Sequence, residues 1–314
     1  MKSLPVISLV SPFYNEGDVV QTFCVSVQTL FNQHPEFSFE MICVDDGSKD
    51  ETLSKLISFA QSDSRFRIIE LSRNFGKEAA LTAGLDYSIG DAVIPLDADL
   101  QDPPELIFTM IEQWQKGADV VMARRIDRQS DHYAKRKTAE WFYKIHNLLS
   151  SIKLPENVGD FRLMDRVVVN ALKQLPEQQR FMKGLFTWVG FRTISIDYVR
   201  PARQGGHSKF SGWKLWNFAL EGITSFSAVP LRLWTYIGLL GALTTLFYAT
   251  YIICRTMLFG IEVPGYASLV VIILFFSSLQ LMSIGILGEY IGRIYIESKR
   301  RPLYLVRQQY KKAP

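Results

Sequence analysis

Two long uncharged segments constrain this chain more than any other feature of its sequence. Residues 233–254 and 267–288 each run for 22 residues without a charged side chain. A helix needs about 20 apolar residues to cross the ~30 Å hydrocarbon core of a bilayer. The sequence therefore predicts two transmembrane helices. Because only residues 255–266 connect them, we expect a helical hairpin over 231–292. The alternative is a pair of buried helices in a large soluble domain.

Basic residues beyond the second segment predict the orientation of the hairpin. Residues 293–314 contain seven Lys or Arg and a single acid, Glu297, whereas the connection contains one basic residue, Arg255. Segments rich in Lys and Arg stay on the cytoplasmic side of a membrane. We therefore expect a basic cytoplasmic tail over 293–314 and, with two crossings, a cytoplasmic N-terminal part. The whole chain has a net charge of only +4, so we expect no nucleic-acid partner.

The N-terminal part alternates short β-branched runs with longer amphipathic ones over residues 5–125. Such alternation predicts an α/β fold, a mostly parallel sheet with helices on both faces. We expect this domain to cover residues 1–210. In these sheets the ligand site lies beyond the carboxyl ends of the strands. Residues 211–230, rich in Trp, Phe and Leu, predict an amphipathic helix at the membrane interface, with a core-facing helix as the alternative.

Acidic residues follow two of the predicted strands. One strand ends in the segment 45–48 (DDGS), and another is followed by 97–102 (DADLQD). Carboxylates at an open sheet edge repel one another unless positive charge lies between them. Oxygen ligands of this kind suit Mg²⁺ or Mn²⁺, above all where substrate phosphates complete the coordination. Asp97 and Asp99 are therefore candidate metal ligands, whereas we interpret Asp102 as the residue before a Pro-initiated helix.

Several common catalytic and cofactor motifs are absent from the sequence. There is no GxGxxG after the first strand, no GxxxxGK[ST], no HExxH and no GxSxG. Dinucleotide, P-loop nucleotide, zinc peptidase and serine hydrolase sites are thus unsupported. The three cysteines are widely spaced and form no CxxC, so neither a disulfide framework nor a zinc cluster is predicted.

Four segments at the predicted strand ends together resemble a known family: 12–16 (PFYNE), 44–50 (VDDGSKD), 73–77 (RNFGK) and 97–102 (DADLQD). They resemble the family 2 glycosyltransferases of GT-A fold, and more narrowly the polyprenyl-phosphate glycosyltransferases, the group that contains dolichol-phosphate mannose synthase. Further segments, together with the two-helix C-terminus, are most similar to the bacterial bactoprenol glucosyltransferases of O-antigen modification. These further segments are 157–164, 214–217 and 221–226.

The resemblance implies an activity and a location. It implies inverting transfer of a hexose, in the first place glucose from UDP-glucose, to undecaprenyl (bactoprenyl) phosphate. This would occur at the cytoplasmic face of the bacterial inner membrane and serve cell-surface glycan modification. GDP-mannose, UDP-galactose and an amino-arabinose donor stay open. The resemblance also implies a homo-tetramer.

The resemblance further implies roles for individual residues. Asp97, Asp99 and Gln101 match the family's ligands for Mg²⁺ or Mn²⁺. Asp160 matches the base of the bacterial relatives, although the mannose synthases differ at this position. We expect it to position the acceptor or the sugar hydroxyls, or to accept a residual proton. The residues expected to bind the nucleotide sugar are Pro12, Tyr14, Glu16, Asp45, Arg124, Arg203, Ser208 and Lys209. Those expected to bind the acceptor phosphate, beside aromatic residues at the membrane interface, are Arg136 and Lys137.

Two other functions fit parts of the sequence. A processive polysaccharide synthase shares the expected fold, but its QxxRW motif is missing, since the nearest string, 177–181, reads EQQRF. A non-catalytic component that binds or flips lipid-linked sugars is the second alternative. Release of free nucleotide from a nucleotide sugar, with and without polyprenyl phosphate and metal, separates the three.

Overall fold

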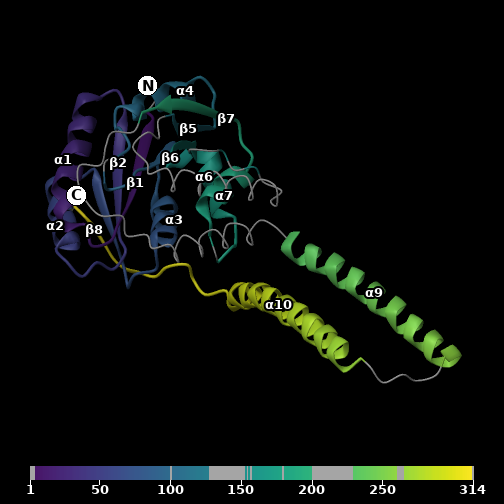
Figure 1. Ribbon diagram of the computed structural model, residues 1–314. Helices are drawn as coiled ribbons and strands as arrows, with labels where there is room; N and C mark the ends of the chain where they lie inside the picture. Colours follow the sequence, from purple (N-terminus) through teal and green to yellow (C-terminus); the bar gives the residue numbers. More distant parts are fainter. Residues whose placement is uncertain are drawn as a thin grey trace.

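The computed structural model describes residues 4–99, 101–126, 153, 155, 158–178, 180–199, 229–259 and 265–312. Within these residues the chain forms an eight-stranded sheet covered by helices on both faces, and two long helices project away from this domain (Figure 1). The strand order is β7-β5-β6-β4-β1-β2-β3-β8, with four parallel and three antiparallel pairs. The predicted α/β fold with a mostly parallel sheet is confirmed, and the antiparallel pairs make the sheet mixed.

The parallel half of the sheet follows the predicted alternation. Strand β1 lies between β2 and β4, β3 pairs with the outer side of β2, and a helix follows each of the four strands. The strands are β1 (Val6–Phe13), β2 (Ser38–Asp45), β3 (Phe66–Leu71) and β4 (Ala92–Pro95). The helices are α1 (Gly17–Gln33), α2 (Thr52–Ser62), α3 (Lys77–Tyr87) and α4 (Leu106–Gln115).

An antiparallel strand interrupts this pattern. Strand β6 (Val158–Asp165) lies between β4 and β5 (Val120–Arg125) and runs opposite to both. Beyond β5 lies β7 (Thr193–Tyr198), parallel to it. Because β6 is reversed, its amino end reaches the edge of the sheet where β1, β2 and β4 have their carboxyl ends. The helices α6 (Arg166–Lys173) and α7 (Met182–Trp188) follow β6 in the chain.

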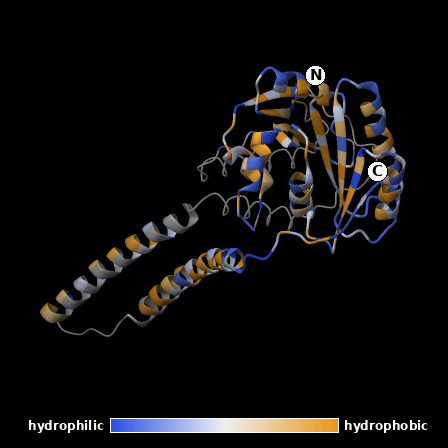
Figure 2. Ribbon diagram, turned by 180° about the vertical axis from the view of Figure 1, so that it is seen from behind, coloured by the Kyte–Doolittle hydropathy of each residue, from blue (hydrophilic) through white to orange (hydrophobic). Residues whose placement is uncertain are grey.

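The core consists of two apolar layers, one on each face of the sheet. Successive strand residues point to opposite faces, so Leu9 and Met41 join one layer while Val10 and Ile42 join the other. Helices α1, α2 and α4 cover the first face, and α3, α6 and α7 cover the second. Figure 2 shows the hydrophobic strands inside this sandwich of helices. The site residues stand at the sheet edge between the two layers.

The end of the chain returns to the sheet, which the sequence did not predict. After α10 the chain turns at Arg300, in the left-handed conformation, and forms strand β8 (Val306–Lys311) antiparallel to β3. Arg307 Nη1 and the Tyr310 hydroxyl both donate to the buried carboxylate of Glu70, at 3.1 and 2.8 Å. Part of the predicted basic tail is therefore an edge strand of the domain.

The two segments predicted as a hairpin are helical. Helices α9 (Val229–Phe259) and α10 (Tyr266–Lys299) contain the predicted segments, and Gly241 of α9 faces the Phe276 ring of α10. In the part of the chain that the structure describes, no helix is both long enough and apolar enough to cross a membrane. The helices are confirmed, whereas the predicted crossings are not. The predicted interfacial helix falls almost entirely on residues that the structure does not describe.

Candidate active site

The loops after β1 and β2 are fixed to each other. Asn15 N donates to Ser48 Oγ at 3.0 Å, and Lys49 N donates back to Asn15 Oδ1 at 2.8 Å. Glu16 N donates to Thr52 Oγ1 at 2.9 Å. Asn15 has a φ of 51°, a left-handed conformation that asparagine tolerates better than most residues. The PFYNE and DDGSKD segments therefore form one ledge at the carboxyl ends of β1 and β2.

Asp45, predicted to bind the nucleotide, is the last residue of β2 and is 1% exposed. Ser48 N donates to its Oδ2 at 3.1 Å, while Oδ1 is buried and has no hydrogen-bond partner among the described residues. Burial raises the pKa of this carboxyl, and the nearby Glu70 and Asp50 act in the same direction. An unsatisfied buried acceptor is costly. The other predicted nucleotide residues at this ledge are Pro12, Tyr14 and Glu16.

The neighbouring Asp46 holds the loop that precedes α3. Its two carboxylate oxygens accept from Phe75 N at 2.7 Å and from Gly76 N at 2.9 Å. Gly47 has a φ of 67°, and a Cβ there would lie 2.5 Å from the carbonyl carbon of Arg73. Only glycine allows the two loops to approach so closely. The contact sets where α3, and with it Lys77, begins.

Asp97 and Asp160 are neighbours although 63 residues separate them in the sequence. Ala92 of β4 pairs with Asp165 of β6, and Val93 pairs with Met164. Asp97 follows the end of β4, and Asp160 lies near the amino end of the antiparallel β6, so both reach the same edge of the sheet. Lys77 Nζ lies between the two carboxylates, 2.8 Å from Asp97 Oδ1, 3.0 Å from Asp97 Oδ2 and 3.0 Å from Asp160 Oδ2.

Positive charge surrounds Asp160. Burial raises the pKa of its carboxyl, but Lys77, Lys183 and Arg162 outweigh burial, so the pKa lies below its usual range. Removal of the Lys77 ammonium from water lowers its pKa, yet the two carboxylates more than reverse this and raise it. Burial raises the pKa of Glu78 to about 8, with Asp160 acting in the same direction. The site therefore holds a charged carboxylate beside a second acid that gains a proton readily.

The predicted metal ligands follow β4 directly. Asp97 has a side chain that is 34% exposed, and Gln101 N donates to Asp99 Oδ1 at 3.2 Å, which closes a tight turn. Among the described residues, no group of three or more His, Cys, Asp or Glu side chains is arranged to hold a metal ion. Two carboxylates and an amide oxygen still suit Mg²⁺ or Mn²⁺, which often binds through few protein ligands plus substrate phosphates. The residue types thus fit such an ion.

Arg124, predicted to bind the diphosphate, is paired with an acid at the same edge. Its guanidinium donates to Asp197 of β7 through two bonds, at 2.6 and 2.9 Å. Both side chains are exposed, and Arg124 lies opposite Val158 in the β5–β6 register. Hydrogen bonding to Asp197 raises the pKa of the guanidinium. A diphosphate that binds Arg124 has to share it with Asp197 or displace that carboxylate.

Five predicted site residues lie outside the described part of the chain, and the structure says nothing of them. They are Arg136, Lys137, Arg203, Ser208 and Lys209.

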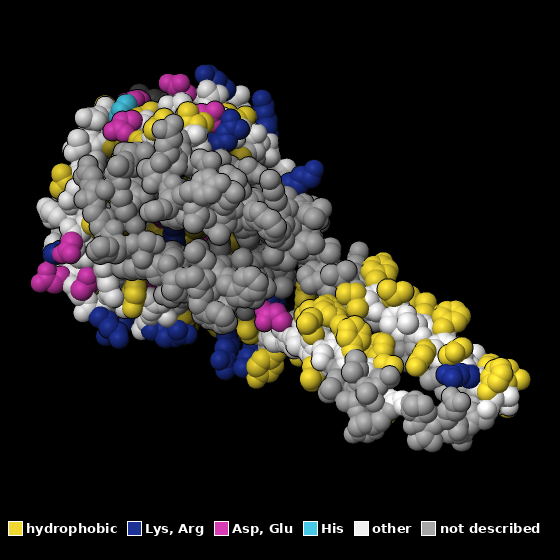
Figure 3. Space-filling model, viewed as in Figure 1, with side chains coloured by type: hydrophobic (Ala, Val, Ile, Leu, Met, Phe, Trp, Pro, Cys, Tyr) yellow, Lys and Arg dark blue, Asp and Glu magenta, His cyan; other side chains and the backbone are white. Residues whose placement is uncertain are grey.

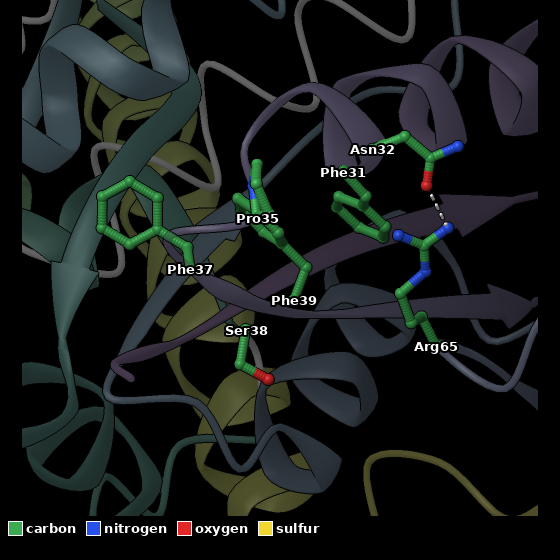
Figure 4. A pocket seen from close by; sticks show the side chains of 7 residues that line it. All are labelled: Phe31, Asn32, Pro35, Phe37, Ser38, Phe39 and Arg65. Carbon is green, nitrogen blue, oxygen red and sulfur yellow. Dashed lines mark hydrogen bonds between the residues drawn. The ribbon is translucent and has the colours of Figure 1, made fainter. Parts of the chain in front are cut away.

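A surface pocket lies at the other end of the sheet. It surrounds the start of β2, whereas Asp45 ends that strand, so it is not the site described above (Figure 4). Arg65 reaches across its wall to Asn32 Oδ1 at 2.9 Å and is held by Asp63. Its lining residues are Phe31, Asn32, Pro35, Phe37, Ser38, Phe39 and Arg65.

Comparison with known proteins decides the family. The sequence profile of glycosyl transferase family 2 matches residues 8–173, more than half of the chain. The chain belongs to glycosyl transferase family 2. A bactoprenol glucosyl transferase of Shigella phage SfV is 54% identical over 306 residues, which cover 98% of this chain and 99% of the relative. A prophage bactoprenol glucosyl transferase homolog of Escherichia coli (strain K12) is 53% identical, with 96% and 98% covered.

A solved structure similar to this family 2 glycosyltransferase is glucosyl-3-phosphoglycerate synthase from Mycobacterium tuberculosis, in complex with Mn²⁺, UDP-glucose and phosphoglyceric acid. It aligns with a TM-score of 0.47 and 19% identity over 70% of this chain and 77% of that chain. The homo-tetramer implied by the resemblance gains no support from these comparisons.

Sequence reasoning missed four charged residues of the site. The sequence pattern assigns no role to Lys77, in the RNFGK segment, or to Glu78, Arg162 and Lys183. Arg162 is 2% exposed, and its guanidinium lies over the Phe186 ring. The acidity of the site is the signal that could point to these cations, because neighbouring carboxylates repel one another unless positive charge lies between them.

Proposed function

We propose that this glycosyltransferase moves a hexose, in the first place glucose from UDP-glucose, onto the phosphate of a polyprenyl (bactoprenyl) phosphate at a membrane surface. The observation that carries the proposal is the placement of Asp160 and Asp97 around Lys77 at the sheet edge that also holds Asp45. It occurs in a chain similar over nearly its whole length to proteins named bactoprenol glucosyl transferases. A bacterial cell-surface glycan is the proposed destination of the sugar.

The donor binds along the ledge formed by the first two loops. Asp45, with a buried oxygen free of any described partner, accepts hydrogen bonds from the nucleotide. Asp97, Asp99 and Gln101 hold Mg²⁺ or Mn²⁺, which, when bound, supplies positive charge against the diphosphate leaving group. The remaining proposed contacts to the nucleotide sugar are Pro12, Tyr14, Glu16, Arg124, Arg203, Ser208 and Lys209.

The reaction is a single displacement with inversion. A phosphate oxygen of the acceptor forms a bond to the anomeric carbon while the bond from that carbon to the diphosphate oxygen breaks, and the nucleoside diphosphate leaves. A phosphate monoester is mostly ionised at neutral pH, so little proton transfer is needed. Asp160, whose pKa is held low by the cations around it, positions the acceptor or the sugar hydroxyls, or accepts a residual proton. Arg136 and Lys137 bind the acceptor phosphate.

The helices α9 and α10 place the enzyme at the membrane where this acceptor resides. Large apolar side chains are exposed along both helices, among them Leu240, Phe247 and Leu281. Figure 3 shows hydrophobic side chains spread over the projecting helices. Exposed apolar surface of this extent marks a membrane or protein contact. We extend the proposal to the bacterial inner membrane, with segments 233–254 and 267–288 as its two spans.

The return of the chain to the domain supports the proposed sidedness. The chain leaves the domain before α9 and returns to it after α10, where strand β8 pairs with β3. Two crossings bring the tail back to the starting side, as the basic residues of 293–314 also require. Domain and tail then share the cytoplasmic face, where nucleotide sugars are available.

The purified full-length chain in lipid nanodiscs tests the proposal. UDP-glucose, UDP-galactose and GDP-mannose are each supplied with Mg²⁺ or Mn²⁺, with and without undecaprenyl phosphate, and nucleotide release is measured. We expect release that depends on both lipid and metal and is fastest with UDP-glucose, and a lipid product that carries one sugar. The Asp160→Asn variant is expected to lose most turnover, whereas Lys116→Gln, on the exposed end of α4, keeps it.

The other outcomes identify the alternatives. Faster release with another donor reassigns the sugar and leaves the reaction intact. A product with many sugars indicates a processive synthase. Absence of lipid-dependent release with every donor overturns the proposal and favours a non-catalytic binding component. Wild-type turnover of Asp160→Asn at saturating lipid between pH 6 and 8 removes the role given to Asp160.

A further inference from the structure

Lys77 joins the two carboxylates to which the proposed reaction gives separate tasks. Its ammonium lies 2.8 and 3.0 Å from the two oxygens of Asp97 and 3.0 Å from Asp160 Oδ2. Two neighbouring carboxylates repel each other. A cation between them converts this repulsion into attraction and fixes their separation. Lys77 is thus the contact that links the proposed metal ligand to the proposed base.

The fold fixes the backbone of Lys77 in place, although the side chain is 48% exposed. The two residues before it, Phe75 and Gly76, donate their backbone N–H groups to Asp46. Lys77 then begins α3, whose next turns are buried against the sheet through residues such as Leu81. Its backbone therefore cannot move without breaking contacts at both ends.

We propose that Lys77 is a positioning residue that ties Asp97 to Asp160 and competes with the divalent cation for Asp97. The inference rests on the proposed function for the identity of the site. Both oxygens of Asp97 are within hydrogen-bond distance of the ammonium. A metal ion that binds this carboxylate has to displace the lysine from it. Asp160 keeps its bond to Lys77, so the same lysine holds the base in place while the metal ligand is released.

Competition between Lys77 and the metal ion for Asp97 predicts that removal of Lys77 strengthens metal binding while it slows turnover. Lys77→Gln removes both a competitor for Asp97 and a positive charge near the metal, so Mn²⁺ binding becomes roughly tenfold tighter. Turnover at saturating Mn²⁺ nevertheless falls at least tenfold, because Asp160 loses the contact that orients it. Lys77→Arg keeps the charge and is expected to bind Mn²⁺ like the wild type. Lys116→Gln, exposed and distant, changes neither quantity.

Mn²⁺ binding is measured by electron paramagnetic resonance of the free ion on the full-length protein, without donor or lipid. A double-mutant cycle with Asp160→Asn completes the test. When Asp160 loses its charge, the Lys77 ammonium interacts with Asp97 alone and competes more strongly with the metal. Asp160→Asn should therefore weaken Mn²⁺ binding more when Lys77 is present than in the Lys77→Gln background. Thermal unfolding confirms that each variant is folded.

The outcomes separate this inference from the proposed function. Unchanged or weaker Mn²⁺ binding in Lys77→Gln, additive effects in the cycle, or no Mn²⁺ binding by the wild type overturns the role of Lys77. Should Lys77→Gln fail to fold, weakened Mn²⁺ binding in folded Lys77→Arg overturns it as well. The metal measurements use no sugar donor. Failure of lipid-dependent turnover therefore rejects the proposed function while tighter Mn²⁺ binding still supports the inference.

Discussion

Asp45 shows how a residue proposed to bind the nucleotide can oppose folding. Burial raises its pKa above the value in the unfolded chain. The folded state then holds this proton more tightly than the unfolded state does, so the free energy of unfolding falls as pH rises through the folded pKa. We expect Asp45→Asn to keep or raise the melting temperature at pH 8 and to weaken UDP binding roughly tenfold. Thermal unfolding at pH 5 and pH 8 and calorimetric titration with UDP measure the two effects.

Asp63 provides the matched case of opposite sign. Arg65 lowers the pKa of this carboxyl to about 2 through a close ion pair, 2.6 Å between Nη2 and Oδ2. The stabilisation is present above the unfolded pKa of about 3.9 and is lost as pH falls toward 2. Asp63→Asn should therefore cost about 2 kcal/mol of unfolding free energy at pH 7. Urea unfolding at pH 7 and pH 3 checks it.

The two aspartates control for each other. An Asp45→Asn variant that loses as much stability at pH 7 as Asp63→Asn would mean that the Asp45 carboxylate is satisfied in the folded state. An Asp63→Asn variant whose cost is equal at pH 7 and pH 3 would mean that the Arg65 pair contributes nothing through charge.

Candidate residues for the site can be proposed one by one from the sequence, whereas their arrangement in space cannot. Acids after apolar runs identify Asp97 and Asp99, and family resemblance identifies Asp160. Their adjacency depends on the register between β4 and β6, which no local pattern encodes. The sequence does not predict the role of Lys77, because a lysine at the start of a helix is usually solvated. Its contacts depend on the two carboxylates that the sheet places beside it.

At the level of elements, the sequence does not determine the direction of a strand or which strand pairs at the edge of the sheet. Hydrophobic alternation predicts that a segment is a strand but not which way it runs, so the reversal of β6 was not foreseen. The segment that forms β8 belongs to the predicted basic tail, 293–314, whose excess of Lys and Arg gives no sign of a strand. Most of its side chains are exposed and polar, as is common in an edge strand. Two of its side chains, Arg307 and Tyr310, donate to Glu70, which lies on the neighbouring strand β3.

The contact between β8 and β3 yields an element-level prediction. Tyr310→Phe removes one donor to the buried Glu70 carboxylate and should lower the free energy of unfolding by about 1 kcal/mol. Gln308→Ala, at an exposed position of the same strand, should stay within about 0.5 kcal/mol of the wild type. Urea unfolding compares the two. Equal stability of both variants would show that β8 is held by its backbone ladder alone.

At the scale of the whole molecule, α9 and α10 project from the domain while the chain end returns to it (Figure 1). The candidate site and the apolar helices are therefore separate parts joined at both ends of the hairpin. Glu297, in the last turn of α10, accepts from Gln178 N at 2.9 Å, shortly before α7 begins. Changes on the projecting helices should accordingly affect lipid contact and leave the nucleotide ledge unchanged.

This separation leads to a prediction about membrane binding. The full-length protein is expected to float with vesicles, whereas the Ile273→Lys and Leu281→Lys double variant should lose at least nine-tenths of that binding. Each lysine placed among apolar side chains of α10 costs about 3 kcal/mol at bilayer depth. Ile89→Lys, on an exposed isoleucine of the domain, is the matched control and should float like the wild type. Calorimetric UDP binding should be equal in all three proteins.

Equal flotation of the double variant and of Ile89→Lys would contradict a membrane role for α10. Loss of UDP binding in the double variant would show that the helices support the site directly.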